Sequence, residues 1–138
     1  MRRYCFPHKK ELSRMFGEAD RPVVDVYLNT KSGDWFQVSP YADSGSDITL
    51  FPGSVCEILN LNLDEGEEST ITGISGEEIK IFIHNIKIKI GEEEMDIRAG
   101  FCVREDIPYL LGRTDILSHF DICFESDKVC FIVKKNTF

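Results

Sequence analysis

The stretch YADSGSDITLFP, residues 41–52, places a short polar loop between two apolar segments. WFQV, which carries a strand signal, precedes the loop, and ITLF follows it. Asp43 lies at the start of the loop, directly before Ser44 and Gly45. Because glycine lacks a Cβ, the backbone can turn sharply there. We therefore expect a carboxylate held at a turn just beyond a strand, where it can face a cleft instead of the core.

An isolated Asp-Ser-Gly is compatible with a second interpretation, a solvated Asx turn between strands. The two segments that accompany the motif favour a chemical role. TITGISGE (70–77) has the Gly-x-x-Gly spacing of a hairpin tip. PYLLGRTDIL (108–117) places two apolar residues before Gly112-Arg113, and within 110–120 we predict a helix after this Gly-Arg pair.

Most of the remaining chain predicts strands. VVDVYLNT (23–30) and WFQVSPYA (35–42) form a predicted hairpin around the turn at 31–34. Isoleucines alternate with polar residues on both sides of His84-Asn85, but the phase of the alternation changes there, which predicts a bulge or bend. Many short strands at close spacing are typical of a small closed all-β domain.

Helical signals are few and short. Pro52 predicts a helical turn directly after it, since proline suits the first helical position. Leu12, Met15 and Phe16 have the spacing of one face of a short helix. We expect residues 1–20 to be an N-terminal extension, helical or flexible, and residues 21–138 to form the domain.

Composition excludes several classes of protein. The 138 residues contain 16 Lys and Arg against 24 Asp and Glu, a net charge of −8, which repels phosphates and disfavours nucleic acid or an anionic membrane as a partner. No apolar run approaches the roughly 18 residues that span a membrane. Charges interrupt the N-terminus too early for a signal peptide. These features predict a cytoplasmic protein.

The five cysteines predict neither a disulfide framework nor a zinc site, because their number is odd and none are spaced as C-x-x-C. A turn at Ser126-Asp127 would place Cys123 opposite Cys130 on neighbouring strands. We expect these two to be reduced thiols, as in most cytoplasmic proteins. The three histidines are scattered, so we predict no metal and no cofactor.

Three motifs in this order resemble the retropepsin-like aspartic proteases, the single-domain type that dimerises, over roughly residues 22–135. The family's D-[ST]-G-[AS]-[DN] loop matches Asp43-Ser44-Gly45-Ser46-Asp47, its glycine-rich flap tip is similar to Gly73-Ile74-Ser75-Gly76, and its Gly-Arg motif is similar to Leu110-Leu111-Gly112-Arg113. Thr114 stands where the family more usually has Asp or Asn. The resemblance implies a small closed acid-protease-like barrel with a flap hairpin and one short C-terminal helix, assembled as a homodimer.

The activity that the resemblance implies is hydrolysis of peptide bonds by two carboxyl groups that share one proton. The chain has one Asp-Ser-Gly, so the second carboxyl group would be Asp43 of a partner chain across a two-fold axis. The resemblance implies that Ser44 bonds across this axis and that Asp47 braces the loop or the substrate, paired with Arg113. We also expect the Ser46 hydroxyl to donate to Asp43 and to lower its pKa, giving an acid-shifted pH–rate profile.

The implied substrate is an extended peptide or unfolded protein beneath the flap. Its side-chain pockets would be walled by apolar residues, for which core packing is the alternative role: Ile48, Leu50, Ile74 and Ile107.

Two other functions remain open. The chain could be a non-catalytic dimeric module that uses this fold to bind peptides or to brace an assembly. It could also be an acidic β-barrel binding domain in which the motif occurs by chance. The intact Asp-Ser-Gly favours the enzyme, since a scaffold does not need Asp43.

Overall fold

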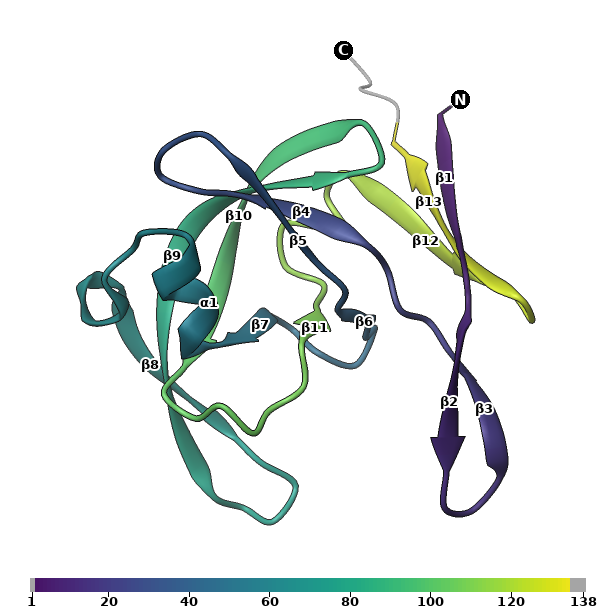
Figure 1. Cartoon of the computed structure of the whole chain (residues 1–138), viewed down its shortest axis with the longest axis horizontal. Helices are drawn as coiled ribbons and strands as arrows, with labels where there is room; N and C mark the ends of the chain where they lie inside the picture. Colours follow the sequence, from purple (N-terminus) through teal and green to yellow (C-terminus); the bar gives the residue numbers. More distant parts are fainter. Residues whose placement is uncertain (1, 135–138) are drawn as a thin grey trace.

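A computed structural model describes residues 2–134, so the last residues of the predicted domain, 135–138, lie outside the described part. The protein is mostly β-structure (Figure 1). Its main sheet contains eight strands, in the order β5-β4-β9-β10-β7-β11-β6, with β8 beside β9. Their bounds are β4 Val26–Asn29, β5 Trp35–Val38, β6 Tyr41–Ala42, β7 Thr49–Pro52, β8 Glu67–Thr72, β9 Glu78–Ile90, β10 Glu93–Cys102 and β11 Leu110–Leu111.

The main sheet curls into a half-barrel (Figure 1). The predicted barrel is therefore not closed, because the end strands β5 and β6 do not pair with each other. The predicted hairpin at 23–42 is confirmed, with Val26 opposite Val38. The helical turn predicted after Pro52 is also confirmed as α1 (Gly53–Ile58), and a 3-10 turn follows at Leu63–Glu65.

The chain ends meet in a second, three-stranded sheet. In this sheet β1 (Arg3–Pro7) and β12 (Phe120–Phe124) flank β13 (Lys128–Val133), the last strand. The predicted register of Cys123 opposite Cys130 is confirmed. Part of the predicted N-terminal extension thus lies in one sheet with the C-terminal strand, while the division into 1–20 and 21–138 stays a prediction.

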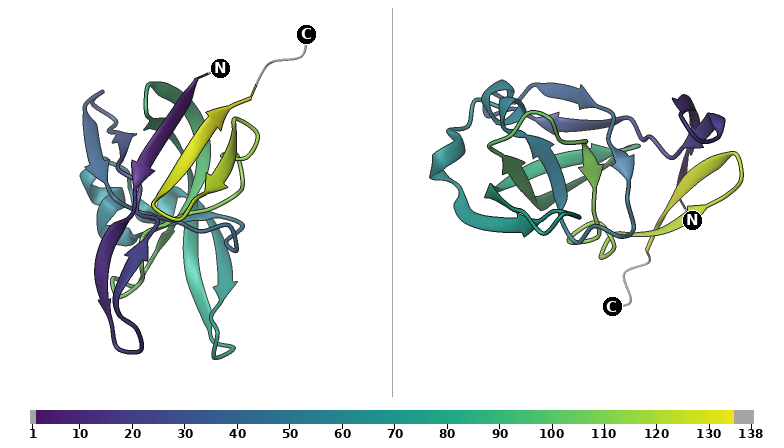
Figure 2. Two further views of the ribbon diagram at one scale, coloured as in Figure 1. Left: turned by 90° about the vertical axis from the view of Figure 1, so that its right-hand side faces the viewer. Right: turned by 90° about the horizontal axis from the view of Figure 1, so that it is seen from below.

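The helix predicted around Leu12, Met15 and Phe16 is wrong. These residues lie at the end of a hairpin formed by β2 (Lys9–Ser13) and β3 (Gly17–Arg21), which projects from the body of the molecule (Figures 1 and 2). All three side chains are exposed, so no buried face supports a helix at their spacing.

The helix predicted after Gly112-Arg113 is also wrong. Leu110–Leu111 form β11, and a series of turns leads from there to β12. Asp115 interrupts helical geometry because its φ is 68°, in the left-handed region. The family resemblance implied a short C-terminal helix, but the α-helix found within residues 2–134 is α1, directly after β7.

Strand β9 explains the change of phase at His84-Asn85 without the predicted bulge. Its pairing with β10 is continuous, from Ile81 opposite Cys102 to Ile90 opposite Glu93. The two halves of β9 instead bury opposite faces in different apolar clusters. The main core takes Ile86, Ile88 and Ile90, whereas a second cluster, beside the β8–β9 hairpin, takes Ile79, Ile81 and Ile83.

The prediction that the chain has no disulfide is wrong. Cys5 of β1 and Cys130 of β13 are joined by a disulfide, although 125 positions separate them in the sequence. Spacing along the chain cannot reveal such a pair, because the fold alone brings the two strands together. Cys56, Cys102 and Cys123 are free thiols. Within residues 2–134, no helix has both the length and the apolar character needed to cross a membrane.

Candidate active site

Asp43 follows β6 at the point where the short strands β6 and β11 pair in parallel. Its backbone N–H donates to the Leu111 carbonyl at 3.0 Å. Its carboxylate Oδ1 accepts the N–H of Gly45 at 2.9 Å, and its carbonyl accepts the N–H of Ser46 at 3.2 Å. The local geometry is therefore an Asx turn that holds a half-buried carboxylate in one orientation.

The loop that begins at Asp43 is joined to the Gly-Arg segment by backbone hydrogen bonds. The N–H of Arg113 donates to the Ser46 carbonyl at 3.0 Å, and the N–H of Thr114 donates to the Asp47 carbonyl at 2.8 Å. The motifs at 43–47 and 110–113 are thus brought together, as their shared resemblance implied. Thr114, where the family more often has Asp or Asn, takes part through its backbone.

Gly112 and Thr49 make a second connection inside the protein. The N–H of Gly112 donates to the Thr49 hydroxyl at 3.0 Å, and Thr49 is fully buried. A Cβ on Gly112 would overlap the backbone of Ile48, so only glycine allows the two segments to approach this closely. The sequence analysis did not predict the role of Thr49. The feature that could have indicated it is that Thr49 is the single polar residue inside the apolar run ITLF.

The expected hydrogen bond from Ser46 to Asp43 is wrong for the isolated chain. The Ser46 hydroxyl donates to the Ile48 carbonyl at 2.7 Å. The turn directs this side chain along the loop, toward its own backbone. The acid-shifted pH–rate profile predicted from a Ser46 donor to Asp43 therefore has no structural basis.

The expected ion pair between Asp47 and Arg113 is likewise wrong for the isolated chain, where the Arg113 N–H donates to the Ser46 carbonyl and the Asp47 carbonyl accepts the Thr114 N–H. The carboxylate–arginine pair near this segment is Asp115 with Arg98 of β10. The guanidinium donates through Nε to Oδ2 and through Nη2 to Oδ1, both at 3.0 Å, and the Arg98 N–H donates to Oδ2 at 2.8 Å. These bonds from Arg98 lower the pKa of Asp115 below its usual value.

Asp43 borders an open groove of about 670 Å³. One side of the groove is the loop after β6, and the other is the hairpin of β8 and β9. Most of its lining is apolar. All four residues proposed as pocket walls line the groove: Ile48, Leu50, Ile74 and Ile107. Four further predicted site residues also line it: Gly45, Ser46, Asp47 and Gly73. Of the four proposed pocket walls, Leu50 is nearly buried in the second cluster, whereas Ile74 is fully exposed.

The predicted hairpin tip at 73–76 is confirmed as a tip. The N–H of Gly73 donates to the Glu77 carbonyl at 2.8 Å, and the N–H of Gly76 donates back to the Gly73 carbonyl at 3.0 Å. Gly76 has a φ of 83°, which favours glycine. The hairpin extends beyond the body of the molecule (Figure 2), and Ser75 and Gly76 lie outside the groove lining.

A smaller hollow of about 180 Å³ lies beside Asp43. It is bordered by Ser44 and Arg113, two predicted site residues that do not line the groove, and by apolar residues of the C-terminal segment such as Leu117 and Phe124. Asp43 is common to both hollows. In residues 2–134, no group of three or more His, Cys, Asp or Glu side chains could hold a metal ion.

Two solved structures of aspartic proteases resemble this chain. A retropepsin-like aspartic protease from Rickettsia conorii is 13% identical, with a TM-score of 0.68 over 94% of this chain and 98% of that chain. EIAV protease, complexed with the inhibitor HBY-793, is 24% identical, with a TM-score of 0.54 over 71% of this chain and 86% of that chain. No family model and no curated protein matches the sequence. At these identities the likeness establishes the architecture: the chain has the retropepsin-like fold.

Proposed function

We propose that the protein is an aspartic endopeptidase whose active form is a homodimer. The observation that carries this proposal is the position of Asp43, a half-buried carboxylate fixed by the Gly45 N–H at the edge of an open, mostly apolar groove. A solvated turn has no need of such a groove. The retropepsin-like architecture adds support, because the two solved structures described above are proteases.

The chemistry needs two carboxyl groups a few ångströms apart. Two such groups cannot both be ionised, so one keeps its proton and the other stays a base. The base takes a proton from a water molecule, which attacks the peptide carbonyl, while the protonated partner donates to the carbonyl oxygen. The pair titrates as a unit, so its two pKa values belong to the pair.

A second chain is the proposed source of the second carboxyl group. No other Asp-Ser/Thr-Gly occurs among the 138 residues. An isologous dimer places the same residue of both chains on a two-fold axis, which joins Asp43 to its copy without further sequence. Ser44 and Arg113 border the second hollow that includes Asp43, where a partner chain could contact them.

The proposed substrate is an extended peptide or a locally unfolded protein. Its backbone would lie along the groove as an added strand, with alternate side chains toward the apolar lining. The β8–β9 hairpin would act as a flap, with Ile74 at its tip in contact with substrate. Closure would exclude water and strengthen the electrostatic interactions around the carboxyl pair.

Cleavage of a denatured protein at about pH 4–6 tests this proposal, because one carboxyl group of such a pair stays protonated in that range. Asp43→Asn retains the side-chain oxygen that accepts the Gly45 N–H, so it removes the charge with little change in shape. We expect this variant to lose cleavage and a statine-type transition-state mimic to inhibit the native protein. Asp64→Asn, at an exposed position of the 3-10 turn, should leave cleavage unchanged.

Cleavage that persists in Asp43→Asn would contradict the proposal. A stable dimer that cleaves nothing would instead support the dimeric peptide-binding or scaffold module. Analytical ultracentrifugation over a dilution series, compared with specific activity over the same series, separates the enzyme from both alternatives.

A further inference from the structure

Three cysteines lie in one row across the terminal sheet. Cys130 of the central strand β13 is directly opposite Cys5 of β1 on one side and Cys123 of β12 on the other. Directly opposite residues of neighbouring antiparallel strands project from the same face of a sheet. The three sulfurs therefore lie on one face, although they come from both ends of the chain.

This face is the outer one. The neighbours of the cysteines along each strand, Phe6, Ile122 and Phe131, pack in or against the main core, so the alternate positions point outward. Cys5 and Cys123 are exposed. Cys130, between them, is fully buried. Its sulfur can therefore be attacked by the directly opposite Cys123 thiol, whereas an external reagent reaches the two outer cysteines of the row.

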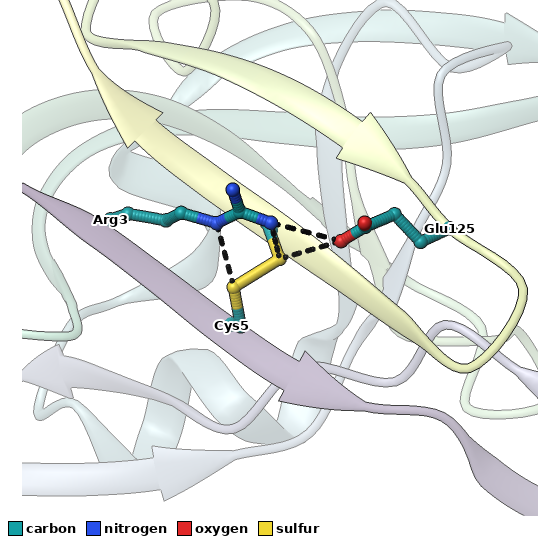
Figure 3. A network of polar contacts seen from close by, with 4 residues as sticks. Arg3, Cys5 and Glu125 are labelled. Carbon is teal, nitrogen blue, oxygen red and sulfur yellow. Dashed lines mark hydrogen bonds and ion pairs between the residues drawn. A yellow bond between two sulfur atoms is a disulfide. The ribbon is translucent and has the colours of Figure 1, made fainter.

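A charged pair lies over the bridged cysteines (Figure 3). Arg3 Nε is 3.2 Å from the sulfur of Cys5, and Arg3 Nη2 is 3.3 Å from the sulfur of Cys130. The same Nη2 donates to Glu125 Oε2 at 3.0 Å, and this oxygen lies 3.3 Å from the Cys130 sulfur. A guanidinium beside a sulfur favours its thiolate form, which is the form in which a leaving sulfur departs.

From this arrangement we propose that Cys5, Cys130 and Cys123 form an intramolecular thiol–disulfide exchange site. The Cys123 thiolate attacks the Cys130 sulfur, and a Cys123–Cys130 bond forms as the Cys5–Cys130 bond breaks. The Cys5 sulfur leaves with the electron pair and then takes up a proton. One disulfide and one thiol are present before and after the exchange, so the step needs no external oxidant or reductant.

The exchange changes which strand the disulfide links to β13. A Cys5–Cys130 bond ties β1 to β13 across 125 positions of sequence, whereas a Cys123–Cys130 bond lies within the β12–β13 hairpin. After exchange, β1 is held to β13 by non-covalent contacts alone, namely the strand pairing and the packing of Phe6 on Phe131. β1 leads directly into the projecting β2–β3 hairpin, so exchange releases the covalent anchor of this N-terminal arm.

Disulfide mapping by mass spectrometry tests the proposal on the full chain. The protein is equilibrated in a glutathione redox buffer at about pH 8, where thiolates exchange, and is then quenched with acid and alkylated. We expect two linkages in the native protein, Cys5–Cys130 and Cys123–Cys130. Cys123→Ser should contain the first linkage alone, and Cys5→Ser should contain the second alone. Cys56 and Cys102, which are buried, should be alkylated only after unfolding and provide the internal control.

Hydrogen exchange measures the consequence for β1. Amides of residues 3–6 should exchange faster in Cys5→Ser than in Cys123→Ser, while those of β9 and β10 should not differ. A single Cys5–Cys130 linkage in the native protein after prolonged equilibration would overturn the proposal, whether or not the variants fold. Equal protection of β1 in the two variants would overturn the release of the N-terminal arm.

Discussion

The buried hydroxyl of Thr49 accepts a hydrogen bond from the backbone N–H of Gly112 at 3.0 Å. This bond joins β7, the strand that follows the Asp43 loop in the chain, to the Gly-Arg segment that follows β11. Neither partner carries charge or touches the carboxylate. Their contact nevertheless fixes the loop, because it satisfies a backbone donor in a region that water does not reach.

Thr49→Val should therefore destabilise the protein and reduce cleavage. Valine has nearly the shape of threonine but leaves the Gly112 N–H without an acceptor, which costs about 1–3 kcal/mol of unfolding free energy. Thr70→Val, on the exposed side of β8, is the matched control and should change stability by less than about 0.5 kcal/mol. Urea denaturation measures both; equal stability of the two variants would contradict the role given to Thr49.

Gly112→Ala should be among the most damaging single-methyl substitutions in the chain. The added Cβ would overlap the Ile48 backbone, so the loop must move, at an expected cost of about 2–3 kcal/mol. Gly73→Ala is the control, since its Cβ would meet only the flexible Glu77 side chain. If thermal unfolding gave the two variants the same midpoint, the close approach at Gly112 would not be required.

Asp115 predicts a specific pH dependence of stability. Hydrogen bonds from Arg98 lower its pKa in the folded state below the usual 3.8, so folding favours the ionised form. The resulting stabilisation is complete above the unfolded-state pKa and is lost as the pH falls through the folded-state pKa. Asp115→Asn should thus be less stable than the native protein at neutral pH, with the difference disappearing in acid. Asparagine tolerates the left-handed conformation of this position, so the backbone is retained.

Urea denaturation of the native and Asp115→Asn proteins at several pH values measures this difference. Asp64→Asn should show no comparable pH-dependent change. A difference between native and Asp115→Asn that stayed constant into strong acid would mean that the Arg98–Asp115 pair does not stabilise the fold through charge.

Ile74 tests the proposed flap. Its side chain is fully exposed and is not needed for packing, so Ile74→Ser should leave stability within about 0.5 kcal/mol. If Ile74 contacts substrate, the loss of its apolar surface should reduce kcat/KM by about tenfold. Leu12→Ser removes an equally exposed apolar residue from the β2–β3 hairpin and should leave kcat/KM unchanged. Equal kinetics for the two variants would assign the β8–β9 hairpin another role.

Local patterns in the sequence predicted the local structure of the site well. The turn at Asp43, the hairpin tip at 73–76 and the register of Cys123 opposite Cys130 each depend on residues close together in the chain. The Cys5–Cys130 disulfide could not be predicted, because only the complete fold brings β1 beside β13.

The incorrect predictions share a different cause, a local preference that another contact overrides. The left-handed backbone at Asp115, held by Arg98, interrupts the helix predicted after Gly112-Arg113. The Ser46 hydroxyl was expected to reach Asp43, yet the Ile48 carbonyl two residues later is its acceptor. The phase change in β9 predicted a bulge or a bend because a single buried face was assumed. The pairing with β10 has no bulge, and two apolar clusters take opposite faces of the strand.

A subunit-mixing experiment tests most directly whether the active site needs Asp43 from two chains. Native and Asp43→Asn chains are mixed in equal amounts, unfolded, refolded together at constant total concentration and assayed for cleavage. If both carboxyl groups are required and pairing is random, activity should fall to about one quarter of the all-native value. Activity of about one half would show that each native chain works alone and would contradict the dimeric site.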